Sequence, residues 1–187
     1  MIETKPGTRP SLSRKVTRRR FLQTTAQAGA ILMAPTIIPE KALGLGGAIP
    51  PSEKIILGGI GIGGRGSFVL RRMLNEPDVQ FVAICDAQKS QRENIKALAD
   101  QHHGNTDCKM YPDIREFLAE RTDIDAVLIT TGDRWHASAS IMAMRAGKDV
   151  YSEKPSSMTI QEGQVVVETA RRFGRVYQTG TQRLSED

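Results

Sequence analysis

Glycines recur at the spacing G-x-G-x-x-G within residues 61–66, directly after an apolar run at residues 55–60. In this pattern Gly61 permits a tight strand-to-helix turn, Gly63 lets the backbone approach a pyrophosphate, and Gly66 lets the helix pack on the strand. Free N–H groups at the start of the helix can then hold the anion. The spacing therefore predicts dinucleotide binding, with a merely structural glycine turn as the alternative.

An acidic residue stands where such a site needs one. Asp86 follows a second apolar run at residues 81–85 and lies 20 residues beyond Gly66. Its carboxylate can accept both hydroxyl hydrogen bonds of an adenosine ribose. The same charge would repel the 2′-phosphate of NADP at close range. We therefore expect NAD as the cofactor and NADP as the weaker ligand.

Strand and helix patterns alternate along the rest of the chain. The run at residues 125–131 has the continuous apolar character of a strand that is covered on both faces of a parallel sheet. Further strands are predicted at residues 110–111, 149–152 and 175–179, and helices at residues 88–101, 114–121, 137–146 and 160–173. About six strands separated by helices predict an α/β fold with a doubly wound parallel sheet of the Rossmann type.

The cysteines and the paired histidines give no sign of a metal or redox centre. Cys85 falls at the end of a predicted core strand, where cysteine is usually a small apolar residue, and Cys108 falls in a polar loop. Nothing in their spacing supports a disulfide. His102 and His103, next to Gly104, are predicted to lie in a solvated loop. We expect no metal site.

The net charge of +5 is distributed unevenly. Residues 1–44 carry eight of the 26 basic residues and two of the 21 acidic ones, so this segment has a net charge of +6. The other 143 residues carry 18 basic and 19 acidic residues and are nearly neutral. A basic face for a phosphate backbone is therefore not expected, and nucleic acid is excluded as a partner.

The basic N-terminal segment resembles a twin-arginine export signal. Residues 17–23 read TRRRFLQ, with Gln23 where Lys is more usual, and a moderately apolar run follows at residues 24–38. That run is too short and too rich in Ala and Gly for a stable membrane anchor. We expect residues 1–47 to be signal peptide and linker, and the protein to reach the periplasm or the medium already folded. A disordered basic tail is the alternative.

Three later segments, together with the glycine turn, resemble the Gfo/Idh/MocA family of oxidoreductases. They read TTGDRWHA at residues 130–137, AGKDVYSEKP at residues 146–155 and QTGTQR at residues 178–183. The resemblance covers about residues 54–183 and implies that residues 48–187 form the NAD-binding Rossmann domain. The family has a second α/β domain, which holds most of the substrate pocket and the usual oligomer interface, and we expect this chain to lack it.

The resemblance implies several groups of cofactor contacts. The pyrophosphate would be wrapped by Gly61, Ile62, Gly63, Gly64, Arg65 and Gly66, and the adenosine ribose would be bound by Asp86. The nicotinamide end of the site would be lined by Thr131, Asp133, Trp135, His136, Glu153, Lys154 and Gln182. The loop departs from the family at Gly132, where relatives often have Pro, and at Arg134, where they often have His or Asn.

Lys154 is the catalytic residue that the resemblance implies. Oxidation of an alcohol requires loss of the hydroxyl proton while hydride leaves the carbon, and a lysine can stabilise the oxygen or carry the proton. The alternatives from the residues alone are an ordinary surface lysine at Lys154, a locally hydrogen-bonded residue at His136, and a packing residue at Trp135.

The expected function is that of the cofactor-binding part of an NAD-dependent oxidoreductase. Its substrate would be a sugar, a polyol or a related carbohydrate, and the full-length protein would be a homo-oligomer. One alternative is an NAD-dependent glycosidase of the same superfamily, which uses NAD in transient oxidation and elimination. The other is a cofactor-binding remnant without catalytic activity.

Export is expected to depend on the arginine pair. Lysine at both Arg18 and Arg19 should leave the protein in the cytoplasm, as followed by cell fractionation. Arg20 allows a shifted pair, so a triple lysine variant is the stricter test. Unchanged export of the triple variant would mean that another route reads the leader.

Overall fold

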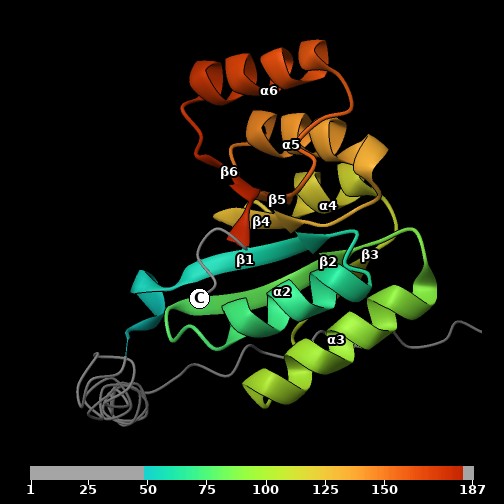
Figure 1. Ribbon diagram of the computed structural model, residues 1–187. Helices are drawn as coiled ribbons and strands as arrows, with labels where there is room; N and C mark the ends of the chain where they lie inside the picture. The colour runs from blue at the N-terminus through green and yellow to red at the C-terminus, as the bar shows by residue number, and fades with distance from the viewer. Residues whose placement is uncertain (1–48, 183–187) are drawn as a thin grey trace, which may run out of the picture. The chain divides into compact units, whose positions relative to one another are not determined.

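The computed structural model describes residues 49–182, so the predicted export signal lies outside the described residues. Within that range, six parallel strands form one sheet in the order β3-β2-β1-β4-β5-β6. Helices α2 and α3 cover one face of the sheet, and α4, α5 and α6 cover the other (Figure 1). This arrangement confirms the predicted doubly wound Rossmann sheet.

The elements follow the predicted alternation closely. The strands are β1 (Ile55–Ile60), β2 (Val79–Cys85), β3 (Lys109–Tyr111), β4 (Ala126–Ile129), β5 (Asp149–Glu153) and β6 (Tyr177–Gly180). The α-helices are α2 (Gly64–Leu74), α3 (Lys89–His103), α4 (Ile114–Glu120), α5 (His136–Arg145) and α6 (Ile160–Phe173). Two short 3-10 helices are η3 (Pro51–Glu53) and η4 (Asp133–Trp135). None of the helices in the described range is long and apolar enough to cross a membrane.

Apolar side chains on the two faces of the sheet form two cores. Along β4, Val127 and Ile129 belong to the core under α4, α5 and α6, whereas Leu128 belongs to the core under α2 and α3. Successive side chains of a strand point to opposite faces, so a strand buried on both faces is apolar at every position. The strand β4 ends at Ile129, two residues before the predicted end, which leaves Thr130 and Thr131 in the following turn.

The paired histidines correct the sequence prediction. They form the last turn of α3, and this helix runs on until Gly104, whose φ of 67° closes it in the left-handed conformation. The ring of His103 turns back to the sheet, where its Nε2 accepts a hydrogen bond from the backbone N–H of Phe81 at 3.2 Å. Burial, followed by the neighbouring His102, lowers the pKa of His103. The sequence predicted a solvated loop here because the residues of this last helical turn are polar.

Cys108 is buried, in contrast to the expected polar loop, and its backbone is hydrogen-bonded to side chains of α3. Asp100 accepts a hydrogen bond from the backbone N–H of Cys108 at 3.1 Å, and Lys96 donates one to its carbonyl oxygen at 2.8 Å. Both Cys85 and Cys108 are buried and free. Burial, helped by Asp86 for Cys85 and by Asp100 for Cys108, raises the pKa of each thiol to about 12. Neither thiol is a reactive thiolate at neutral pH.

Candidate functional site

The candidate site lies at the carboxyl ends of the strands. The sheet order reverses between β1 and β4, and open α/β sheets bind ligands in the crevice at such a point. The glycine turn follows β1, Asp86 follows β2, and Thr131 follows β4. The same edge of the sheet carries Glu153 at the end of β5 and Gln182 shortly after β6. The fold therefore brings to one edge residues that lie far apart in the sequence.

The glycine turn is packed against the end of β4. Gly61 has a φ of 67°, and a Cβ at this position would collide with the side chain of Thr131. A Cβ at Gly66 would collide with the hydroxyl of Thr130. That hydroxyl donates a hydrogen bond of 3.0 Å to the carbonyl oxygen of Gly61. The first and third glycines are therefore required by the close contact of the turn with β4.

The middle of the turn is open. A Cβ at Gly63 or Gly64 would meet no heavy atom of the described chain within 4 Å beyond its immediate neighbours. Gly63 is the N-cap of α2, and no side chain of the described residues caps this end of the helix. The side chain of Ile62 is fully buried, so only its backbone faces the turn. The first N–H groups of α2 thus point to free space that suits an anion.

Asp86 lies directly after β2 and is half-buried. One oxygen of its carboxylate accepts a hydrogen bond from the backbone N–H of Gln88 at 2.8 Å. The guanidinium of Arg92 donates to the carbonyl oxygens of Asp86 and Ala87, at 2.6 and 3.1 Å. The guanidinium of Arg92, six residues beyond Asp86, is therefore held on the backbone of this turn.

Glu153 joins the end of β5 to the glycine turn. Its carboxylate is buried and accepts hydrogen bonds from Nε2 of Gln182 at 2.6 Å, from the backbone N–H of Lys154 at 3.2 Å and from Nε of Arg65 at 3.4 Å. Burial raises the pKa of this carboxyl, but the three donors outweigh it and hold the pKa below the ordinary value of 4.5. Glu153 is thus a charged carboxylate that gathers Arg65, Lys154 and Gln182 around the site.

The turn after β4 presents both exposed and buried groups. Asp133 and Trp135 are exposed on η4, and Trp135 is 61% exposed, so it does not pack in the described core. The hydroxyl of Thr131 is buried and has no hydrogen-bond partner within residues 49–182. An orphaned buried hydroxyl beside the glycine turn is a polar group that a ligand can satisfy.

His136 and Lys154 differ sharply in exposure. His136 is 1% exposed, with one ring nitrogen 2.7 Å from the carbonyl oxygen of Pro155 and the other 2.9 Å from that of Thr131. Lys154 is exposed, and its peptide bond to Pro155 is cis. The resemblance implies that His136 contacts the cofactor. In the structure, both nitrogens of its ring already face carbonyl groups of the protein.

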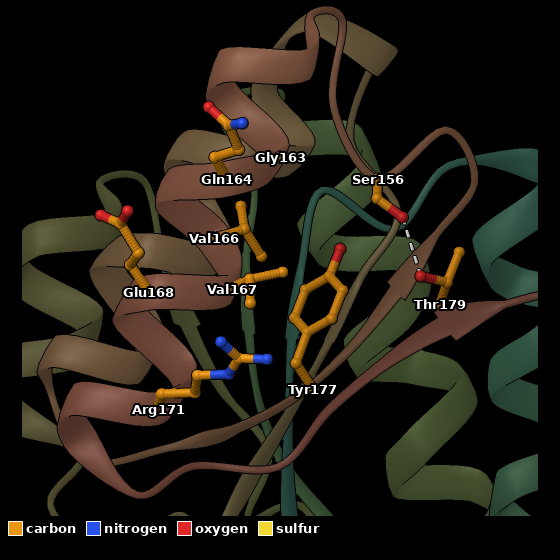
Figure 2. A pocket seen from close by; sticks show the side chains of 9 residues that line it. All are labelled: Ser156, Gly163, Gln164, Val166, Val167, Glu168, Arg171, Tyr177 and Thr179. Carbon is orange, nitrogen blue, oxygen red and sulfur yellow. Dashed lines mark hydrogen bonds between the residues drawn. The ribbon is translucent and has the colours of Figure 1, made fainter.

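A pocket between α6 and β6 was not foreseen from the sequence (Figure 2). It is lined by hydroxyl side chains of Ser156, Tyr177 and Thr179 together with residues of α6. Ser156 and Thr179 share a hydrogen bond of 2.7 Å, and the hydroxyl of Tyr177 is buried with no partner within the described residues. The only sequence signal was the position of Ser156, two residues after Lys154.

Sequence comparison decides the family. The profile of the oxidoreductase family with an NAD-binding Rossmann fold, GFO_IDH_MocA, matches residues 56–181. The chain belongs to the Gfo/Idh/MocA family. The matched range includes every site residue named above except Gln182, which lies one position beyond it.

Curated relatives of this Gfo/Idh/MocA chain include glycosidases. A glycosyl hydrolase family 109 protein from Shewanella pealeana is 30% identical over 177 residues, which cover 84% of this chain and 38% of that protein. An α-N-acetylgalactosaminidase from Bacteroides fragilis is 33% identical over 135 residues, which cover 72% of this chain and 32% of that protein. The chain thus spans about a third of the length of these relatives.

Solved structures of the family include dehydrogenases. The myo-inositol 2-dehydrogenase from Lactobacillus plantarum superposes with a TM-score of 0.63 at 25% sequence identity, and the match covers 72% of this chain and 38% of that protein. The fold of the described residues is therefore that of the NAD-binding domain of the family.

Alanine at Gly66 should lower the stability of the fold, whereas alanine at Gly63 should weaken NAD binding. Gly66→Ala forces a methyl group onto the Thr130 hydroxyl, and such overpacking typically costs about 1–3 kcal/mol of unfolding free energy. Gly63→Ala adds a methyl group in open space and should weaken NAD binding without loss of stability. Urea unfolding and calorimetric titration with NAD separate the two effects. Equal destabilisation by both substitutions would contradict this account of the turn.

Proposed function

We propose that this chain binds NAD across the carboxyl ends of β1, β2, β4 and β5 and supports hydride transfer from a hydroxyl-bearing carbon of a carbohydrate. One observation carries the proposal. The hydrogen bond between Arg65 and Glu153 joins the glycine turn to the strand end that bears Lys154. A nucleotide on the turn would therefore extend toward the one lysine that the family resemblance singles out.

The described residues suit a dinucleotide at three points. The open start of α2, next to Gly63, offers unpartnered N–H groups and a favourable helix dipole to a pyrophosphate. The carboxylate of Asp86 lies at the end of β2, where a ribose would be bound. The orphaned hydroxyl of Thr131 lies between them and the end of β5, on the side where the nicotinamide half would follow.

Bound NAD would supply a hydride acceptor at its nicotinamide ring. Lys154 would lie beside the reacting hydroxyl of the substrate. Its Nζ, when protonated, stabilises the negative charge that develops on the oxygen, and when neutral it takes the hydroxyl proton. The C–H bond breaks with its electron pair, the O–H proton leaves, and a carbonyl group remains. Glu153 orients this segment through the backbone N–H of Lys154.

A glycosidase reaction is the second candidate, because the curated relatives at 30–33% identity include proteins named as glycosidases. Such an enzyme would oxidise a sugar hydroxyl, eliminate the aglycone, add water and return the hydride. It would release free sugar from a glycoside without net formation of NADH. A dehydrogenase would instead accumulate NADH and a carbonyl product, so both products are measured in one assay.

Export and assembly belong to the same proposal. The twin-arginine pattern at residues 17–23 favours export of a folded protein, which would allow NAD to be loaded in the cytoplasm before translocation. We propose that the full-length protein acts in the periplasm or the medium as a homo-oligomer on a small carbohydrate.

NAD should bind more tightly than NADP. A 2′-phosphate facing the carboxylate of Asp86 meets a like charge, which costs about 1–4 kcal/mol at 4 Å depending on the local dielectric. Calorimetric titration of both cofactors measures the preference, and Asp86→Ser should narrow it. Asp78→Ser, at the opposite end of β2, serves as the control. A wild-type preference for NADP would overturn the role of Asp86 and point to Lys89 or Arg92 as phosphate partners.

Lys154→Ala in the full-length protein should remove most of the turnover and leave NAD affinity nearly unchanged. The reason is that the lysine acts on the substrate oxygen, whereas the backbone contacts of its segment persist. A screen of sugars, polyols and aryl glycosides, read by NADH absorbance and by free sugar, gives the turnover. Lys109→Ala, an exposed lysine on β3, is the matched control. Full activity of the Lys154 variant would refute the assignment, and the 187-residue chain by itself should bind NAD without turnover.

A further inference from the structure

The ring of His136 bridges two segments at the edge of the candidate site. His136 begins α5 and is 1% exposed. Its Nδ1 lies 2.7 Å from the carbonyl oxygen of Pro155, which follows β5, and its Nε2 lies 2.9 Å from the carbonyl oxygen of Thr131, which follows β4. The two carbonyl groups belong to neighbouring strand ends, and the imidazole is the side chain that spans them.

Both partners of the ring are acceptors. A carbonyl oxygen cannot donate, so each contact is a hydrogen bond only when the facing nitrogen carries a proton. A neutral imidazole supplies one such N–H, and the imidazolium supplies two. A carbonyl group that loses its donor is destabilised, so each segment that the ring bonds is tied to it. His136 therefore acts inward, on the backbone, and offers no unoccupied nitrogen to a ligand.

The segment that the ring holds is anchored at three consecutive residues. The backbone N–H of Lys154 donates to Glu153, the carbonyl oxygen of Pro155 faces His136, and the hydroxyl of Ser156 shares a hydrogen bond with Thr179 (Figure 2). Of these anchors, only the one at His136 also reaches the turn after β4. The ring thus sets the spacing between Lys154 and the turn that carries the orphaned Thr131 hydroxyl.

We infer that His136 is a positioning residue, which fixes the backbone of Lys154 relative to the turn at Thr131 through its hydrogen bond to Pro155. The inference rests on the proposed hydride transfer, because it is the placement of Lys154 on the substrate oxygen that the ring secures. The side chain of Lys154 is exposed. Because a lysine stem is flexible, the region that its Nζ can reach is set by the location of its backbone. Small displacements of a reacting group reduce rates steeply.

Two amide variants separate the two contacts of the ring. The amide nitrogen of Asn is as many bonds from Cβ as Nδ1 of His, so His136→Asn can keep the donor to Pro155. The amide nitrogen of Gln corresponds in the same way to Nε2, so His136→Gln can keep only the donor to Thr131. Val166→Ala, a cavity in the same core, reports the effect of lost stability alone.

The first measurement is amide hydrogen exchange at Lys154 in the 187-residue chain, compared with urea unfolding of each variant. Exchange should accelerate in His136→Gln more than in His136→Asn and should follow global stability alone in Val166→Ala. Calorimetric titration with NAD should give affinities close to the wild type for both amide variants. Equal exchange in the two variants, or exchange that merely follows their stability, would overturn the inference.

The second measurement is turnover of the full-length protein. His136→Gln should lower kcat by about 10- to 100-fold with little change in KM, and His136→Asn should lower it less. Equal kcat values in the two amide variants would overturn the positioning role. A wild-type protein that binds NAD but turns over no carbohydrate would overturn the proposed function and the catalytic part of this inference. Hydrogen exchange at Lys154 would still decide whether the ring holds the backbone of that segment in place.

Discussion

The contact between the glycine turn and the end of β4 is the constraint on which the site depends. Thr130 and Thr131 lie where a Cβ at Gly66 or Gly61 would be, so helix α2 can start only in this direction and at this distance from the sheet. The hydrogen bond from Thr130 to Gly61 holds the turn in place from the same side. Because the turn is fixed by its contacts with the end of β4, its middle stays open and the first N–H groups of α2 face the crevice.

A buried carboxylate extends this arrangement to the next strands. Burial alone would favour protonation of Glu153, but three hydrogen-bond donors from three different segments keep it charged. Removal of any one donor would leave charge less well compensated in a buried position. The glycine turn, the end of β5 and the segment after β6 are therefore held together by one residue, and Lys154 is the next residue along the chain.

The sequence predicted the fold far better than the contacts of the site. Apolar runs and helical periods indicate the strands and helices because burial imposes those periods, and α6 and β1 were predicted to the residue. Side-chain pairing has no such period. Arg65 and Glu153 are 88 residues apart, and neither residue type nor spacing indicates that they meet. Cys108 was predicted to lie in a polar loop because its neighbours are polar, whereas it is buried and its backbone is held by Asp100 and Lys96 of α3.

Relatives named as dehydrogenases and as glycosidases share the part of the protein that this chain represents. That sharing has a physical reason. In the function proposed above, both candidate reactions begin with loss of hydride from a carbon and of a proton from its hydroxyl oxygen, so both need a nicotinamide site and a group that stabilises the substrate oxygen. They diverge only after the carbonyl group has formed, when a leaving group is either expelled or absent. On that proposal, the turn at Gly61, the carboxylate of Glu153 and the backbone around Lys154 would serve the first step of either reaction.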